Sequence, residues 1–522
     1  MSDTIKKSYT LNYVKIYVLN ISAIILNVCS LFVVLPVISN NQELYGIYSI
    51  CISLNVFFSY ADLGFISAGM KYASEDYAKQ NYTEEKKIIG FVGFILLLFV
   101  IVFSLSILAI AYKPQWLFSN LKEGVNQFVA SKLLLTLALF APVVILQRVL
   151  QMIYSIRLED FIFQSINIVA NLLKISSVFY FFRNEKYDLV GYFFFNQVVT
   201  VIGILVASIV AEKRYKSSLF SLIPHMRFSR TVYLKTKTLA LSTFLLSLSW
   251  IVYYELDAYV LAKISTPTIV ALYAVGLMLL SFVRSLFGAI FNPFTARFNH
   301  LIGLNDWSTL KSLYNRVIVV MLPLTLLPLV AVNLFVSPFI LSWIGTNFAE
   351  AIRPASFLLM SNLLAFITYP AGVLIIARKH ARLLYTVAFL LPIFYWLGVI
   401  LFFHEFGFTT LAFMKFFSFV CLGIFYMRYS IKYLELTFIE FFNKYIFKVI
   451  PSLLFLGVYW YFLNPFLPAD KSNLHLIVVT ITIGVGAILS MVIYYLFTSE
   501  FRNYLNDIMY KWWASVKLKM AR

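Results

Sequence analysis

Long apolar runs separated by short polar segments recur along the whole chain. A run of about 20 apolar residues crosses the roughly 30 Å hydrocarbon core of a bilayer as an α-helix, because each residue adds about 1.5 Å. The pattern therefore predicts an all-α polytopic membrane protein with about 14 transmembrane helices. These helices are expected at 14–38, 44–69, 89–112, 133–155, 161–182, 189–211, 238–262, 269–292, 317–344, 354–377, 383–403, 408–427, 449–463 and 474–497.

Composition supports the same class. Of the 522 residues, 61% are hydrophobic and 12% are charged, and the mean hydropathy of +0.86 excludes soluble globular proteins. The first apolar run is too long for the core of a secretory signal, so we expect it to be retained as a helix. The sequence has no Walker loop, GxSxG elbow or HExxH motif, and its cysteines and histidines show no metal-ligand spacing. We therefore predict no catalytic residue, no metal site and no cofactor.

The net charge of +19 indicates membrane topology. An even number of helices places both termini on one side, and the loops on that side carry several times as many Lys and Arg residues as the opposite loops. Loops rich in Lys and Arg stay in the cytoplasm, so both termini are predicted to be cytoplasmic. This distribution argues against a nucleic-acid partner.

The basic segment 212–237 follows the sixth predicted helix and has the composition of a linker between two lobes. Its alternative role is that of a topology signal that touches anionic headgroups. Many transporters are built from two such repeats with the substrate site between them. The predicted organisation is an N-terminal lobe at 1–211, the linker at 212–237, a C-terminal lobe at 238–431, additional helices at 432–497 and a cytoplasmic amphipathic tail at 498–522.

Ionisable residues fall inside several predicted helices. A charge at the bilayer centre costs about 2.5 to 3.5 kcal/mol on insertion scales, so such residues are expected to face protein or a water-filled cavity. The basic residues of this kind are Lys15, Arg148, Lys174, Arg284 and Lys415, and the acidic ones are Asp62, Glu255 and Asp257.

Lys174 stands near the middle of its predicted helix. Gln164, Asn167, Asn171 and Lys174 recur at helical spacing and give a continuous polar stripe on one face. A helix packed only against lipid would not carry such a stripe. The stripe predicts either a cavity wall or a polar contact sealed between helices.

The other basic residues are weighed by the polar residues on their own helical faces. Arg148 shares a helical face with Gln151, with snorkelling to the inner headgroups as the alternative. Arg284 aligns with small and polar residues of its own helix. Lys15 lies near a helix end, where snorkelling is an equal alternative, and Lys415 has only Ser418 as polar company.

The acidic residues Asp62 and Asp257 also predict helical faces that contact water. Asn55 and Asp62 lie on one side of the helix expected at 44–69, and Asp257 continues a polar and aromatic stripe in the helix expected at 238–262. For both acids the alternative is a structural ion pair with a neighbouring Lys or Arg.

These positions predict a cationic cavity for an anionic substrate, because Arg and Lys bind phosphate and carboxylate oxygens. The predicted substrate-binding residues are Arg148, Lys174, Arg284, Lys15 and Lys415. The predicted polar or ion-coupling residues are Asp62, Asp257, Asn167, Asn171, Gln151 and Asn55.

Short motifs in both halves point to a known family. They are Tyr45-Gly46-Ile47-Tyr48, Tyr60-Ala61-Asp62-Leu63-Gly64-Phe65, Lys71-Tyr72-Ala73, Asp257 with Ala258 to Ala262, Leu272-Tyr273-Ala274, and Pro293, which is expected to close its helix. With these residues and its helix count, the chain resembles the Wzx-type bacterial polysaccharide flippases of the multidrug/oligosaccharidyl-lipid/polysaccharide exporter superfamily.

The resemblance implies two six-helix lobes around a central cavity, two additional C-terminal helices, and alternating access. The implied cargo is an oligosaccharide repeat unit on polyprenyl pyrophosphate, moved from the cytoplasmic to the periplasmic leaflet of the bacterial inner membrane. Such transport serves the assembly of O-antigen and lipopolysaccharide, capsule or exopolysaccharide. Membrane lipids, an H⁺ or Na⁺ coupling ion and polysaccharide assembly proteins are the further partners that the resemblance implies.

Two other functions stay open. An ion-coupled exporter of drugs or small cations would need exposed acids and aromatic residues, whereas basic residues outnumber acids inside the predicted helices. A membrane polysaccharide polymerase or ligase would need a substantial periplasmic loop, and the longest outward loop, 113–132, has about twenty residues.

Overall fold

The computed structural model describes residues 3–60, 64–121, 124–183, 186–217, 219–378, 381–507 and 510. Throughout these ranges the regular structure is helical, with no strand, which confirms the predicted all-α class. The chain divides into two compact units, Met1–Ala274 and Val275–Arg522. The lobe and linker boundaries expected from the sequence stay predictions.

Eleven helices of the described chain are long and apolar enough to span a membrane, or twelve when the bent pair Thr346–Met360 and Ala365–Ala377 is one span. The sequence predicts about 14. Part of the difference lies in the first two expected spans. The first has described side chains over only part of its length, and the second is broken, as shown below.

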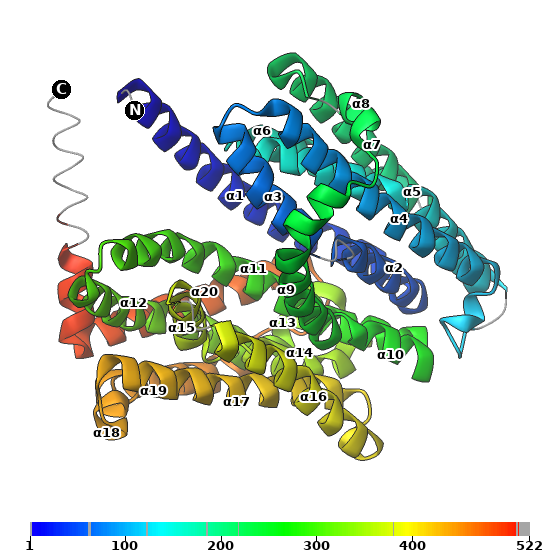
Figure 1. Cartoon of the computed structure of the whole chain (residues 1–522). Coiled ribbons are helices and arrows are strands. Elements are labelled where there is room, and N and C mark those ends of the chain that lie inside the picture. The colour runs from blue at the N-terminus through cyan, green and yellow to red at the C-terminus, as the bar shows by residue number, and fades with distance from the viewer. Residues whose placement is uncertain are drawn as a thin grey trace, which may run out of the picture. The chain divides into compact units, whose positions relative to one another are not determined.

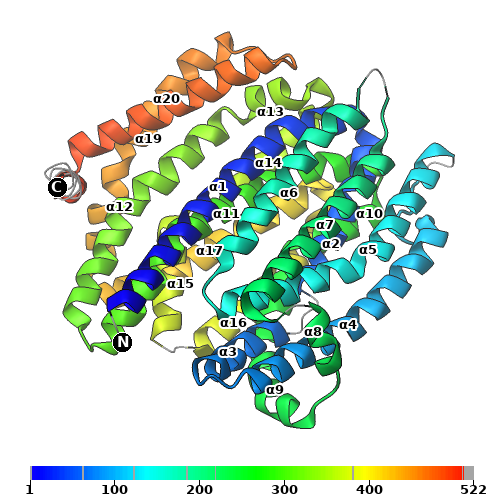
Figure 2. The same ribbon diagram turned by 90° about the horizontal axis from the view of Figure 1, so that it is seen from above.

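The first unit is a bundle whose helices run side by side (Figures 1 and 2). α6 packs between α1 and α7, α7 packs against α5, and α5 also contacts α2 and α4. The helices are α1 (Asp3–Ile38), α2 (Gln42–Tyr60), α3 (Phe65–Ala78), α4 (Tyr82–Tyr112), α5 (Val125–Ile156), α6 (Asp160–Phe181), α7 (Leu189–Tyr215), α8 (Leu219–Leu222), α9 (Arg230–Tyr254) and α10 (Leu256–Ile264).

The second unit begins within α11. Its α12 packs against α15 and α20, α17 packs against α14, α15 and α16, and α19 lies beside α20. The helices are α11 (Pro267–Gly303), α12 (Trp307–Leu334), α13 (Val336–Ile344), α14 (Ile352–Met360), α15 (Ala365–Ala377), α16 (Ala381–Phe406), α17 (Thr409–Leu434), α18 (Phe438–Phe441), α19 (Phe447–Leu463) and α20 (Asn473–Phe497).

The span expected at 44–69 is not one helix, so this prediction is wrong. α2 ends at Tyr60 and α3 begins at Phe65. Gly64 precedes α3 with a φ of 74°, and a Cβ at this position would lie 2.1 Å from Oγ1 of Thr243. Only glycine fits this left-handed turn against α9. The helix expected at 44–69 is therefore interrupted before Phe65, and Asp62 lies outside the described residues.

From the sequence we expected Pro293 to close its helix, and this prediction is wrong. α11 continues through Pro293 to Gly303. A proline removes one backbone N–H, and a long helix inside a protein tolerates this loss when neighbouring groups satisfy the freed carbonyl. The tail expected at 498–522 is helical over 499–507, and most of its remainder lies beyond the described ranges.

Ion pairs join the ends of α4, α5, α6 and α7. Nη2 of Arg157, the residue that follows α5, lies 2.7 Å from Oε1 of the buried Glu85. Glu159, which precedes α6, accepts two hydrogen bonds from the Arg214 guanidinium at 2.6 and 2.7 Å and one from the Tyr215 hydroxyl. Burial raises the pKa of Glu159, but these hydrogen bonds outweigh burial and hold its pKa below the ordinary value. The pairs fix the relative positions of three helices that line the cavity described below.

Gly46 belongs to a motif that resembles the flippases, and its place in the structure is a packing contact. A Cβ on Gly46 would lie 1.8 Å from the carbonyl oxygen of Pro267, at the first residue of α11. We predict that Gly46→Ala destabilises the folded protein by about 1 to 3 kcal/mol, because a backbone carbonyl cannot move aside cheaply. Thermal unfolding in detergent measures the loss.

Gly203→Ala is the matched control, since its Cβ would meet only ordinary contacts at 3.8 Å. This variant is expected to unfold at the wild-type temperature or above. Equal melting temperatures for wild type, Gly46→Ala and Gly203→Ala would contradict the predicted clash.

Candidate functional site

The first unit contains a cavity of about 450 Å³. Residues of α1, α2, α5, α6 and α7 line it, and all of them belong to the segment Met1–Ala274. The volume lies in the range of small-molecule binding sites, about 300 to 1,000 Å³. The cavity is therefore the candidate functional site of this unit.

α6 contributes the polar stripe predicted from the sequence. Gln164, Asn167, Asn171 and Lys174 all line the cavity. The opposite face of α6 is apolar and exposed, with Leu173 at 52% of its full exposure. A hydrophobic outer face and an amide-rich inner face orient α6 with its stripe turned inward, since an amide without a partner is costly in hydrocarbon.

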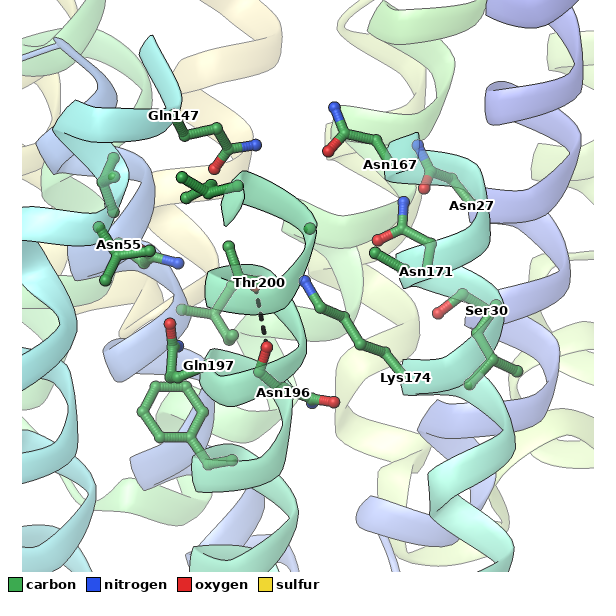
Figure 3. Close-up of a pocket in the computed structure, with 18 of the residues that line it drawn as sticks. Asn27, Ser30, Asn55, Gln147, Asn167, Asn171, Lys174, Asn196, Gln197 and Thr200 are labelled. Atoms are coloured by element: carbon green, nitrogen blue, oxygen red, sulfur yellow. Dashed lines mark hydrogen bonds between the residues drawn. The ribbon is translucent and has the colours of Figure 1, made fainter. Parts of the chain in front are cut away.

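The other helices surround the stripe with further amides and hydroxyls (Figure 3). The Thr200 hydroxyl donates a hydrogen bond to the backbone carbonyl oxygen of Asn196 at 2.9 Å. Its oxygen can therefore still accept a hydrogen bond from a ligand. The lining carboxamides outside α6 are Asn27, Asn55, Gln147, Asn196 and Gln197. Each carboxamide offers two donors and an acceptor, which suits a ligand rich in hydroxyl groups.

Lys174 is the one charged side chain among the described residues that line the cavity. It extends from α6 toward α7 (Figure 3). None of the ion pairs between described residues includes it. An ammonium group within a membrane-spanning helix requires water or an anion to replace its hydration. We therefore expect the cavity to contain water, and its charge suits a ligand with a negative charge.

Aromatic rings form another part of the wall. Tyr48 of α2 lies 6.4 Å from Tyr192 and 5.9 Å from Phe193 of α7, measured between ring centroids. The contact with Phe193 is edge to face. Such rings give an apolar surface beside the amides, so the cavity can contact both the hydroxyls and the C–H faces of one ligand.

The structure brings together four of the residues predicted for the site. Asn55, Asn167, Asn171 and Lys174 line one cavity. Arg148 and Gln151 lie on α5 near the lining residue Gln147, both half-buried, but neither is among the described lining residues. Their assignment to a substrate site stays a prediction.

The remaining predicted residues lie elsewhere. Arg284 on α11 and Lys415 on α17 belong to the second unit; Lys415 is fully buried, with its ammonium 5.3 Å from the Tyr395 ring centroid. Asp257 on α10 is also fully buried and accepts a hydrogen bond from the Tyr273 hydroxyl. The roles proposed for these residues stay predictions.

The Lys15 side chain and the whole of Asp62 lie outside the described residues.

Most of the lining residues outside α6 were not predicted from the sequence. Asn196, Thr200 and Gly203 recur at helical spacing in the apolar segment 189–211, as do Asn27 and Ser30 in the first helix. These are uncharged residues, and a search centred on charges passes over them. Amide side chains spaced three or four residues apart in an apolar segment would have predicted this face of the cavity.

Comparison with solved structures finds the same fold in membrane transporters. The lipid II flippase MurJ, in an inward closed conformation, gives a TM-score of 0.65 at 14% identity, over 92% of this chain and 98% of that chain. A multidrug resistance MATE family transporter of the MOP superfamily, in an inward-facing conformation, gives 0.59 at 12% identity, over 79% and 98% of the two chains. An outward-facing MATE structure gives 0.54 at 12% identity, over 81% and 96%.

No family model and no curated protein matches the sequence. At these identities the likeness is one of fold. The chain is a multi-pass membrane protein with the fold shared by MurJ and the MATE transporters of the MOP superfamily.

The cavity predicts a difference in thiol reactivity between the two faces of α6. In a background in which Cys29, Cys51 and Cys421 are replaced by serine, Asn171→Cys is expected to react with a water-soluble methanethiosulfonate, because it faces the wet cavity. Leu173→Cys is the control: it lies on the exposed apolar face and should react slowly in proteoliposomes, since thiolates form poorly in lipid. Equal labelling of both positions would contradict a wet, one-sided α6.

Proposed function

We propose that this protein translocates a lipid-linked oligosaccharide across the bacterial inner membrane by alternating access. The observation that carries the proposal is the amide-lined cavity with Lys174 as its charge. The fold supports it, because the lipid II flippase MurJ has the same fold over nearly its whole length. O-antigen, capsule or exopolysaccharide assembly is the cellular process to which we assign it, with both termini in the cytoplasm.

The chemistry of the lining suits the sugar part of such a cargo. Carboxamides donate to and accept from hydroxyl groups, and the rings of Tyr48, Tyr192 and Phe193 offer a surface to the C–H face of a pyranose. Lys174 supplies the positive charge for a sugar carboxylate or a phosphate oxygen. The lipid chain would stay in the bilayer while the head group enters the protein.

Arg148, Arg284, Lys15 and Lys415 remain our candidates for the pyrophosphate. A pyrophosphate carries more negative charge than one ammonium balances, so it needs basic residues beyond the lining of this cavity. We assign the glycan to the cavity of the first unit and leave the pyrophosphate to these further residues.

A second candidate function is the export of small cationic compounds, because MATE transporters share the fold. The sign of the charge weighs against it. The described lining contains no Asp or Glu to balance a cation, and its one charge, the Lys174 ammonium, would repel a cation. A polysaccharide polymerase or ligase has less support, since the similar solved structures named above are transporters.

Removing the charge of Lys174 tests the proposal. Lys174→Gln is expected to lower translocation about tenfold or more, because a charge-assisted hydrogen bond contributes about 1.5 to 3 kcal/mol. Lys174→Arg should retain part of the activity. The measurement is the amount of surface polysaccharide, and of lipid-linked precursor left in the inner leaflet, at equal protein levels. Lys213→Gln, an exposed charge at the end of α7, is the matched control and should act as wild type.

Asn171→Asp separates the two candidate functions. The new carboxylate lies one turn before Lys174 on the same face and would neutralise its ammonium. Oligosaccharide translocation is expected to fall as far as in Lys174→Gln. A cation exporter would instead keep or gain activity, measured as efflux of a fluorescent lipophilic cation, and that gain would reject the flippase assignment.

A further inference from the structure

A second pocket lies in the second unit, and charged and aromatic residues not discussed so far line it. It has a volume of about 680 Å³. The ends of several helices form it: Trp307 and Lys311 come from the first turns of α12, Arg378 directly follows α15, and Lys432 and Tyr433 come from the last turn of α17.

Arg378 lies close to two aromatic rings. Its guanidinium carbon lies 5.2 Å from the Tyr433 ring centroid and 6.0 Å from that of Trp307. The guanidinium also donates a hydrogen bond to the side chain of Tyr429, another lining residue. A guanidinium has five N–H donors, so this hydrogen bond and the cation–π contacts leave further donors for a ligand. A guanidinium held in this way is prepared for a planar or tetrahedral oxyanion.

The pocket has an excess of positive charge. Nζ of Lys311 lies 2.7 Å from Oε2 of Glu435, so the one acid of the described lining is already paired. Arg378 and Lys432 take part in none of the ion pairs between described residues. Their two charges are left to face the pocket, and an anion would balance them.

The pocket lies where a membrane surface is expected. The candidate spans Trp307–Leu334 and Thr409–Leu434 begin and end at its lining residues. Trp and Tyr side chains concentrate at the level of lipid headgroups, and Lys and Arg at the cytoplasmic ends of spans contact anionic lipids. The most abundant anion at this depth is a phosphodiester.

We propose that this pocket is a binding site for the headgroup of an anionic phospholipid. The Arg378 guanidinium and the Lys432 ammonium bind the phosphate oxygens, and Trp307 and Tyr433 form the walls that keep Arg378 in place. The site shares no lining residue with the cavity at Lys174 and does not depend on the proposed transport function. It assigns a lipid-binding role to residues that otherwise count only as topology signals.

Native mass spectrometry of the full-length protein tests the proposal. The probe is phosphatidylglycerol, titrated into protein purified in a neutral detergent, with phosphatidylcholine as the uncharged reference. The wild type is expected to retain phosphatidylglycerol saturably. The double variant Arg378→Gln/Lys432→Gln should bind the tightest lipid about tenfold more weakly or worse, because both charge-assisted contacts are lost.

Arg428→Gln is the matched control, since Arg428 is an exposed cation one turn before Lys432 on the same helix but outside the lining. It should bind phosphatidylglycerol as the wild type does. Equal weakening by Arg428→Gln would show a diffuse charge effect and overturn the proposal. Equal retention of phosphatidylcholine, or binding of inorganic phosphate without binding of phosphatidylglycerol, would overturn it as well. Melting temperatures of the lipid-free variants verify that each one is folded.

Discussion

The arrangement of the first unit depends on the free-energy cost of placing the Lys174 ammonium inside a membrane. Lys174 lies well within α6, and no described carboxylate neutralises it. Hydrocarbon would exclude such a group, so the surrounding helices must supply polar partners and room for water. The carboxamides of α1, α2, α5 and α7 meet this requirement, and the exposed leucines on the opposite face of α6 prevent the helix from turning the lysine toward lipid.

This constraint links structure to function. A cavity whose polar groups solvate the Lys174 ammonium also makes that ammonium accessible to a ligand. The amides around it suit a ligand with hydroxyl groups better than an apolar drug. MurJ and the MATE transporters share this fold, although one is a lipid II flippase and the others are multidrug transporters. The fold alone therefore does not identify the cargo. The sign of the charge in the cavity is the reason for which we propose an anionic cargo.

The sequence predicted the helical class and the stripe of α6, because apolar length and polar spacing are local properties of the chain. It did not predict the break after Tyr60, where Gly64 turns against α9, since that turn depends on a contact between segments about 180 residues apart. It also missed the amides of α7 and the aromatic rings close to Arg378. Those residues are ordinary in their own helices and gain a role only when tertiary packing brings several helix ends or faces together.

Identification of the lipids that stay bound through purification tests the central claim most directly. The protein is purified from a host that makes lipid-linked oligosaccharides, and the extracted lipids are analysed by mass spectrometry. The account predicts that the wild type carries a polyprenyl-linked glycan, which Lys174→Gln loses at equal yield. A wild type without such a glycolipid, or a variant that retains as much of it, would contradict the role assigned to Lys174 and its cavity.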